Sequence, residues 1–236
     1  MKKTLVIVLA VILAATVSLL PRAAFAYPRI ITVSKTLNMS HYDPGGACGP
    51  CSGVSIGRYY RDYHSPQYLL LPNGTNYAEM YDDLYSLMGD DEWVNAYGGH
   101  WRQMAIDAGY SWSTFSAVTD IQVDNADTSP ADGMPDCFAA VVNAINNNWP
   151  VALNGQFPDA GGRISTDGNS AWPTEGHYWA IRGYSYKSIT VEGATATWEY
   201  RIVCTDSYSH ANSLVLDWNY LVGHNDHMGT VIIKHS

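Results

Sequence analysis

The chain of 236 residues is predicted to fold as one α+β domain, because helical segments come first along the sequence and short strands follow. Apolar residues recur at helical spacing in several segments before Pro150, and the clearest segment, Tyr77 to Met88, is followed by a glycine. From Pro150 onward, short apolar runs alternate with turn-forming residues. This order indicates helices packed on an antiparallel sheet.

The boundaries of the expected elements follow from the same patterns. A first strand is expected at 30–33. The expected helices are 50–63, 77–88, 101–108 and 137–147, and the later strands are 151–153, 178–181, 196–203 and 230–233. The segment 121–136 is polar and holds two prolines, so it is predicted to be a solvated loop. Its aspartates do not match the pattern of a calcium-binding loop.

The first 26 residues have the features of a secretory signal. Lys2 and Lys3 precede an apolar stretch from Leu5 to Leu20, and Ala24-Phe25-Ala26 provides a small-residue cleavage site. An uncleaved membrane anchor is the alternative, although the apolar stretch is slightly short to span a bilayer. We therefore expect a protein that is secreted, periplasmic or at the cell surface, with residues 27–236 as its folded domain.

The net charge bears on the class of partner. The whole chain has a formal charge of −9, and the signal segment carries three positive charges and no acidic residue, so the mature domain is more acidic still. An acidic protein is poorly suited to bind nucleic acid or an anionic membrane surface. We expect neither as a partner once the signal is cleaved.

The chain has four cysteines, at positions 48, 51, 137 and 204. Disulfides are the default expectation for an exported protein. If Cys48 is kept free for chemistry, at most one intramolecular bridge forms among the other three. An odd thiol in a secreted protein is a candidate reactive group.

Cys48 is the candidate nucleophile, because the residues around it predict a thiol at the N-terminus of a helix. Gly45 and Gly46 bring a flexible backbone up to it, and Pro50 is tolerated in a first helical turn. Unsatisfied N–H groups and the helix dipole favour the thiolate at this position. Small residues in the helix, such as Gly53, indicate close packing against its neighbours.

A cysteine nucleophile needs a base to take its proton and a third group to orient that base. His177 precedes an apolar strand, and a strand is a rigid mount for a general base. Asp206 follows another strand, 200–204. If the two strands pair, Asp206 can accept a hydrogen bond from the imidazole and fix its tautomer.

Four short motifs, in order, resemble the C39-like, papain-fold cysteine peptidases. Cys48-Gly49-Pro50, followed by a small-residue helix with two tyrosines, is similar to that family's C-G-P-T-A…G-Y-Y signature. Asn147–Val151 is similar to its N-x-x-P-hydrophobic strand entry. Gly176-His177-Tyr178 with Gly183-Tyr184 resembles its histidine strand, and Val203–Ser207 resembles its strand-to-aspartate element. His177 follows Cys48 by 129 residues (177 minus 48), close to the roughly 130–150 typical of papain-type enzymes.

The resemblance implies a papain-like α+β fold, with a helical N-terminal half packed on an antiparallel sheet. It implies a peptidase that hydrolyses peptide bonds in a peptide or protein substrate through Cys48, His177 and Asp206 and a thioester intermediate. No metal or organic cofactor is implied.

This sequence departs from the family pattern near the nucleophile. Cys51 and Ser52 stand where the family has Thr-Ala. Papain-like enzymes usually have a glutamine about six residues before the nucleophile as an oxyanion donor, and here Tyr42 takes that place. The backbone N–H of Cys48 can supply one donor, and Tyr42 and His41 are the main candidates for a second, with Asn38 or a backbone amide as further possibilities.

Other interpretations of the same residues remain open. The C-x-x-C pair of Cys48 and Cys51 is also found in thioredoxin-like redox proteins, although the strand–helix–strand context is absent. Cys48 could instead be held in a structural disulfide. Asp217 or Asn219 could take the place of Asp206, since acids at strand ends often form turns.

Two further hypotheses concern function. A papain-fold domain that has lost turnover would act as a binding or surface module. A cysteine amidase or transpeptidase acting on cell-wall peptides would use the same triad. The histidines at 210, 224 and 227 lack the H-E-x-x-H pattern of a zinc peptidase, so a polar turn is the favoured interpretation there.

Overall fold

A computed structural model describes most of residues 27–236. The described residues are 29–42, 44–63, 76–88, 94–107, 115–122, 134, 136–156, 176–191, 194–206, 211–223 and 227–235. The predicted signal segment, most of the predicted loop 121–136, and His210 and His224 lie outside them. The side chain of His227 lies outside the description too.

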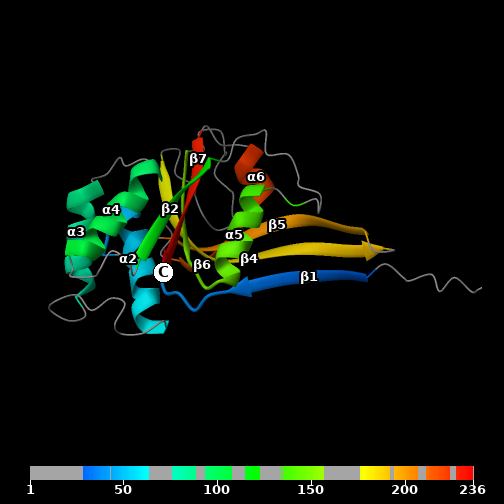
Figure 1. Cartoon of the computed structure of the whole chain (residues 1–236), viewed down its shortest axis with the longest axis horizontal. Helices are drawn as coiled ribbons and strands as arrows, with labels where there is room; N and C mark the ends of the chain where they lie inside the picture. Colours follow the sequence, from blue (N-terminus) through cyan, green and yellow to red (C-terminus); the bar gives the residue numbers. More distant parts are fainter. Residues whose placement is uncertain are drawn as a thin grey trace, which may run out of the picture.

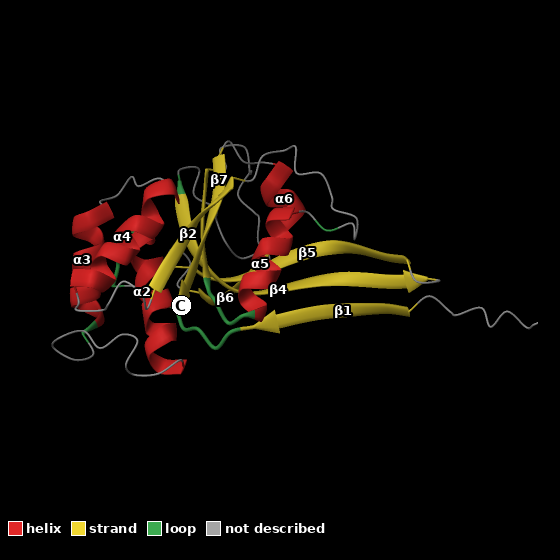
Figure 2. Ribbon diagram, in the orientation of Figure 1, coloured by secondary structure: helices red, strands yellow, loops and turns green. Residues whose placement is uncertain are grey.

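The domain is α+β, as the sequence predicts, and its strands form one antiparallel sheet (Figures 1 and 2). The seven-stranded sheet has the order β2-β7-β3-β4-β5-β6, and β1 pairs with β4. The strands are β1 (Arg29–Thr36), β2 (Phe115–Gln122), β3 (Val151–Gln156), β4 (His177–Val191), β5 (Ala194–Asp206), β6 (Ala211–Asp217) and β7 (His227–His235).

The helices lie in two groups. Three helices gather at one end of the sheet, namely α2 (Cys48–Tyr63), α3 (Tyr77–Met88) and α4 (Val94–Asp107) (Figure 1). Two others, α5 (Asp136–Asn146) and α6 (Trp218–Gly223), lie over the other part of the sheet. Among the described residues, no helix is long and apolar enough to cross a membrane.

Most predicted elements are present, and α3 has the predicted bounds. The loop prediction for 121–136 is wrong at both ends, because residues 121 and 122 belong to β2 and Asp136 begins α5. Three elements, β2, β6 and α6, were not predicted. The strands β2 and β6 lie at the two edges of the sheet, and α6 lies outside it. Such short, half-polar segments are stabilised by packing against their neighbours, so their sequences carry little periodicity of their own.

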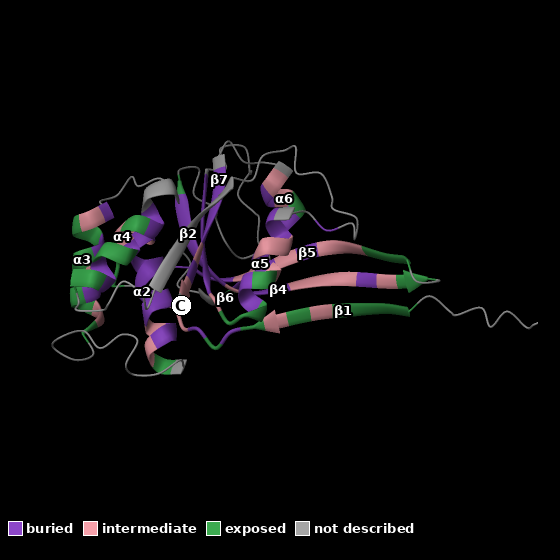
Figure 3. Ribbon diagram, viewed as in Figure 1, coloured by how far each residue is buried: buried purple, intermediate pink, exposed green. Residues whose placement is uncertain are grey.

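Strand β4 is much longer than predicted, because it pairs with different neighbours along its length, and β5 extends beyond its predicted bounds at both ends. The first part of β4, residues 177–181, pairs with β3, and residues 183–190 pair with β1. The second part of β4 and the first part of β5 therefore form with β1 a three-stranded arm that extends beyond the core (Figure 1). Burial decreases along the arm toward its tip (Figure 3).

The change of partner occurs at Arg182 and Gly183. Arg182 is an extra residue in β4 relative to β5, and its carbonyl accepts a hydrogen bond of 2.6 Å from the N–H of Leu37. Its guanidinium donates to the carbonyl of Met39 at 2.8 Å. These bonds guide the segment after β1 along β4 to the start of α2.

Helix α2 packs closely at the centre of the helical group, as its small residues predict. A Cβ at Gly53 would lie 2.7 Å from Leu84 Cδ1 and 3.2 Å from the Tyr97 hydroxyl. The indole N–H of Trp101 donates to the Gly53 carbonyl at 3.2 Å. The absence of a side chain thus lets α3 and α4 approach α2, which holds its first turn firmly against the sheet.

Candidate active site

Cys48 is the first residue of α2, and the chain before it is anchored to α3. Gly45 has a φ of 85°, a conformation that favours glycine, and a Cβ at Gly46 would overlap the Tyr81 hydroxyl at 1.8 Å. The N–H of Ala47 donates to the same hydroxyl at 2.8 Å. The two glycines are therefore needed to bring Cys48 to the helix start at this angle.

The thiol of Cys48 lies against the beginning of β4. The backbone N–H of Tyr178 donates to Cys48 Sγ at 3.3 Å, although the two residues are 130 positions apart. Cys48 is half-buried, and His177 is the residue before Tyr178. The predicted nucleophile and base therefore come together where the helix begins and the strand begins.

His177 and Asp206 also meet, as the pairing of β4 and β5 requires. Ala180 pairs with Thr205, so His177 and Asp206 are diagonal neighbours on one face of the sheet. His177 Nε2 lies 2.7 Å from Asp206 Oδ1, and both side chains are buried. The ring of Trp179 contacts the imidazole edge to face, with centroids 4.5 Å apart. The pair is thereby shielded from water.

The surroundings of Cys48 favour its thiolate. Burial alone would raise the pKa of the thiol, but the hydrogen bond and charge of His177, together with the N–H groups of Tyr178 and Gly49, outweigh it and lower that pKa. These N–H donors and the dipole at the N-terminus of α2 both stabilise the thiolate anion.

His177 changes in the complementary direction. Burial would lower the pKa of the imidazole, but its hydrogen bonds to Asp206 and Cys48 raise that pKa to about 9. Since Nε2 is bonded to Asp206, Nδ1 is the ring nitrogen left for the thiol. A thiol of lowered pKa beside an imidazole of raised pKa favours a thiolate–imidazolium pair.

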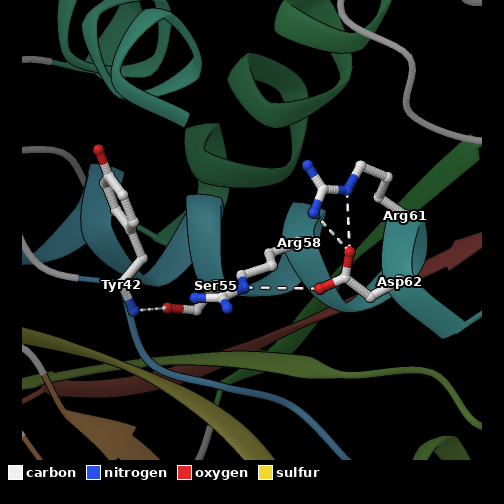
Figure 4. A network of polar contacts seen from close by, with 5 residues as sticks. All are labelled: Tyr42, Ser55, Arg58, Arg61 and Asp62. Carbon is white, nitrogen blue, oxygen red and sulfur yellow. Dashed lines mark hydrogen bonds and ion pairs between the residues drawn. The ribbon is translucent and has the colours of Figure 1, made fainter. Parts of the chain in front are cut away.

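The two oxyanion candidates lie beside this group, on the segment that joins β1 to α2. The backbone N–H of Tyr42 donates to Ser55 Oγ at 3.0 Å, and its ring points away from Ser55 (Figure 4). That ring lies 5.8 Å from the ring of Tyr77. Burial raises the pKa of the Tyr42 hydroxyl, as do nearby Cys51 and Asp82. The backbone amide of Tyr42 is thus already engaged.

His41 lines a small hollow between α2 and the strands β4 and β5, which is too narrow to hold a water molecule. The wall is shared by residues of α2 and by Tyr178 and Thr205 of the two site strands. Because Thr205 precedes Asp206 and Tyr178 follows His177, the hollow adjoins the triad. Asn38, the more distant candidate, is exposed on the same segment.

The alternatives to Asp206 have other roles. Asp217 Oδ1 accepts the N–H of Tyr220 at 3.0 Å and so caps the first turn of α6. Asn219 is exposed on that helix. Of the three acidic or amide residues considered, Asp206 is the one bonded to His177.

All four cysteines are free thiols. Cys51, Cys137 and Cys204 are buried on α2, α5 and β5, and the disulfide expected by default for an exported chain is not formed among them. Burial, and to a lesser extent Asp206, raises the pKa of Cys204 well above its usual value. Among the side chains that the structure describes, no group of three or more histidine, cysteine or acidic residues is arranged to hold a metal.

Tyr97 of α4 supports the site and was not predicted. Its buried hydroxyl lies 2.7 Å from Ser52 Oγ and donates to the Gly49 carbonyl at 3.0 Å. Its ring stacks on Tyr178, with centroids 4.7 Å apart. Tyr97 therefore connects the two residues whose N–H groups face the thiol. Its position ahead of the helix expected at 101–108 gave no sequence signal for this role.

A cysteine at a helix N-terminus, facing a histidine and an aspartate on adjoining strands, is the arrangement that defines the papain-like cysteine peptidases. The model of the family described as Peptidase_C39 like matches residues 30–223. The chain belongs to this family of cysteine peptidases, and its predicted papain-like α+β fold is confirmed.

One solved structure with distant similarity to this chain is the peptidase domain of Streptococcus ComA, described as a bifunctional ABC transporter involved in a quorum sensing pathway. It has 8% sequence identity and a TM-score of 0.36, over 83% of this chain and 97% of that one. No curated protein gives a significant match.

Proposed function

We propose that the protein is an exported cysteine peptidase with Cys48 as nucleophile, His177 as general acid and base, and Asp206 as the residue that orients His177. The observation that carries the proposal is the continuous contact from Cys48 Sγ to His177 and from His177 Nε2 to Asp206, 2.7 Å away. Membership of a cysteine peptidase family supports it.

The chemistry follows from the protonation of this group. The Cys48 thiolate attacks a peptide carbonyl, and the backbone N–H of Cys48 and a second donor, for which His41 and Tyr42 are the candidates, stabilise the oxyanion. The His177 imidazolium then gives its proton to the leaving amine, and a thioester remains on Cys48. His177, now neutral, takes a proton from water, which hydrolyses the thioester and restores the free thiol. No cofactor is needed for any of these steps.

Export and the class of partner belong to the same proposal. The signal-like first 26 residues and the acidic mature domain support a protein that acts outside the cytoplasm on a peptide or protein substrate, with no nucleic acid or membrane as partner.

Alkylation of the native, reduced protein with iodoacetamide, followed by peptide mapping, tests the proposal. We expect Cys48 to be modified much faster than a free thiol below neutral pH, since the thiolate is the reacting form. His177→Ala should remove that advantage. Hydrolysis of an unfolded protein substrate should fall by about 10²–10⁴-fold in the same variant, the usual contribution of a general acid–base group.

Cys137→Ser is the matched control, since Cys137 is buried on α5 away from the triad and should leave both rates unchanged. Alkylation of Cys48 at the rate of an ordinary thiol would overturn the proposal. Fast alkylation without hydrolysis of any protein or peptide substrate would favour the binding module instead.

A further inference from the structure

The catalytic thiol has a second thiol close to it, which the peptidase mechanism does not use. Cys51 follows Cys48 by three residues in the first turns of α2, and the N–H of Cys51 donates to the Ala47 carbonyl at 3.1 Å. Residues three apart in a helix have Cβ atoms about 5–6 Å apart, and disulfides have Cβ atoms about 3.5–4.5 Å apart. Closing a bridge therefore requires the two Cβ atoms to approach by about 1–2 Å, through a local adjustment of the first turn of α2.

The two cysteines also face the same part of the sheet. Cys48 Sγ accepts the N–H of Tyr178, and Cys51 lines the small hollow to which Tyr178 and Thr205 contribute. Both cysteines thus lie on the side of α2 that faces the strands β4 and β5. They are not directed to opposite sides of the helix.

Thiol–disulfide exchange requires one accessible thiol that attacks first and a second thiol that resolves the mixed disulfide, and the exposure of Cys48 and Cys51 differs in this way. Cys48 is half-buried and is stabilised as the thiolate by its N–H donors and by His177, so it can attack an incoming disulfide. Cys51 is 1% exposed and cannot be reached from solvent before Cys48 has reacted. The other two cysteines, Cys137 and Cys204, are buried on other elements.

From this arrangement we propose that Cys48 and Cys51 form a reversible redox site, which low-molecular-weight disulfides or a protein dithiol oxidase convert to an intramolecular disulfide. Disulfide formation shares Cys48 with the proposed peptidase but does not depend on peptidase activity. Only the expected effect of the disulfide on hydrolysis rests on the proposed function.

The exchange takes place in two steps. The Cys48 thiolate attacks one sulfur of the disulfide R–S–S–R, which forms Cys48–S–S–R and releases one thiolate RS⁻. The Cys51 thiol then loses its proton, and its sulfur attacks Cys48 Sγ, which forms the Cys48–Cys51 bond and releases a second RS⁻. Both released thiolates take up a proton, from the two cysteines by way of solvent. The protein loses two hydrogens, and R–S–S–R is reduced to two thiols.

The oxidised form has no thiolate at position 48, so it cannot attack a carbonyl. A thiol reductant reverses both steps. The peptidase would therefore be held inactive in strongly oxidising surroundings and released where reductant is present.

The experiment uses the mature protein and oxidised glutathione as the probe. After reaction, the sample is quenched in acid, alkylated and mapped without reduction. We expect the peptide that contains Cys48 and Cys51 to be two hydrogens lighter and to resist alkylation, with no glutathione attached. Dithiothreitol should restore alkylation of both residues. This measurement needs no peptidase activity, so it remains decisive if the proposed function fails.

The Cys51→Ser variant provides the contrast. It lacks the resolving thiol, so we expect a stable glutathione adduct on Cys48. The matched Cys137→Ser variant should form the same internal disulfide as the wild type. A stable glutathione adduct on Cys48 of the wild type, or full alkylation of both residues after oxidation, would overturn the proposal. If Cys51→Ser does not fold, the peptide map of the wild type alone decides between these outcomes.

Discussion

The hydrogen bond between Asp206 and His177 gives substitution of Asp206 an expected effect on pH dependence. The carboxylate accepts a hydrogen bond from Nε2, and this bond helps to raise the pKa of His177 to about 9 against the burial that would lower it. The thiolate–imidazolium pair persists between the lowered pKa of Cys48 and the raised pKa of His177. The upper limit of that range therefore depends on Asp206.

In Asp206→Asn, we expect the alkaline limit of kcat/KM to move to lower pH, because His177 loses its proton more easily without the carboxylate. The acidic limit of kcat/KM, which the pKa of the Cys48 thiol sets, should move less. The pH dependence of hydrolysis and of Cys48 alkylation measures both limits. Asp217→Asn is the control, since that carboxylate caps α6. An unchanged alkaline limit would show that Asp206 does not set the protonation of His177.

The second oxyanion donor can be assigned by comparing the two candidates. Both residues line the hollow next to the triad, but the Tyr42 ring lies beside Tyr77 and its backbone N–H is used by Ser55. We expect His41→Ala to lower kcat by about 10²–10³-fold, as for loss of one oxyanion donor. Tyr42→Phe should have a small effect. A large loss in Tyr42→Phe with none in His41→Ala would reverse the assignment.

The three triad candidates could be predicted because each carries a local signal in the sequence. Cys48 follows two glycines and precedes a proline, and His177 and Asp206 adjoin apolar strands. Tyr97 could not be predicted, because its role depends on how α4 crosses α2 and β4. A buried tyrosine on a helix looks the same in sequence whether it packs a core or orders an active-site turn.

At the scale of elements, the turn that presents Cys48 depends on its contact with α4. In Tyr97→Phe the ring stays stacked on Tyr178, but the hydroxyl that bonds Ser52 and the Gly49 carbonyl is lost. We expect a loss of about 1 kcal/mol in the free energy of unfolding, the usual net value of one hydrogen bond. Chemical denaturation measures this change. Tyr85→Phe, on an exposed position of α3, should change stability very little.

The junction of β1 and β4 leaves no room for a side chain at Gly183. A Cβ there would lie 2.7 Å from the Lys35 carbonyl oxygen and 3.1 Å from Thr36 Cα, so the backbone of β1 would have to move. We expect Gly183→Ala to destabilise the fold by about 1–3 kcal/mol, the usual cost of overpacking.

Gly99 offers the opposite case, because it is exposed on α4 and a Cβ at this position would meet no atom within 4 Å. Gly99→Ala should stabilise the protein by up to about 1 kcal/mol through helix propensity. Denaturation midpoints of the two variants, compared with the wild type, test both predictions. Equal effects of the two alanines would show that close packing at Gly183 does not matter.

The same junction explains why the sheet was harder to predict than the helices. The helix α3 has its own period of apolar residues and could be placed from sequence alone. The length of β4 depends on pairing with β1, which lies about 150 residues earlier in the chain (183 minus 36 is 147). Pairing between distant segments leaves no local pattern, so the β1 and β5 strands of the arm were predicted but the outer half of β4, residues 182–191, was not.

At the scale of the whole molecule, the stability of the sheet should be uneven. The inner part of β4 lies between β3 and β5 and is fully buried at residues 177–181. At the arm tip, residues 29–32, 190–191 and 194–196 are exposed (Figure 3). The Lys187–Glu199 ion pair, at 2.6 Å, joins two strands of the arm, but both side chains are 40% exposed. Such a surface pair contributes little stability.

Amide hydrogen exchange should therefore divide β4 into two parts. We expect the amides of 177–181 and of its partner β3 to exchange only with global unfolding, because buried strands open rarely on their own. Amides near 189–191 and 195–196 should exchange much faster through local opening of the arm, and residues 30–32 of β1 should follow them. Lys187→Ala should leave the slow amides unchanged. Equal protection along the whole of β4 would mean that the arm and the core unfold as one unit, and that the active-site end of β4 is no more rigid than its tip.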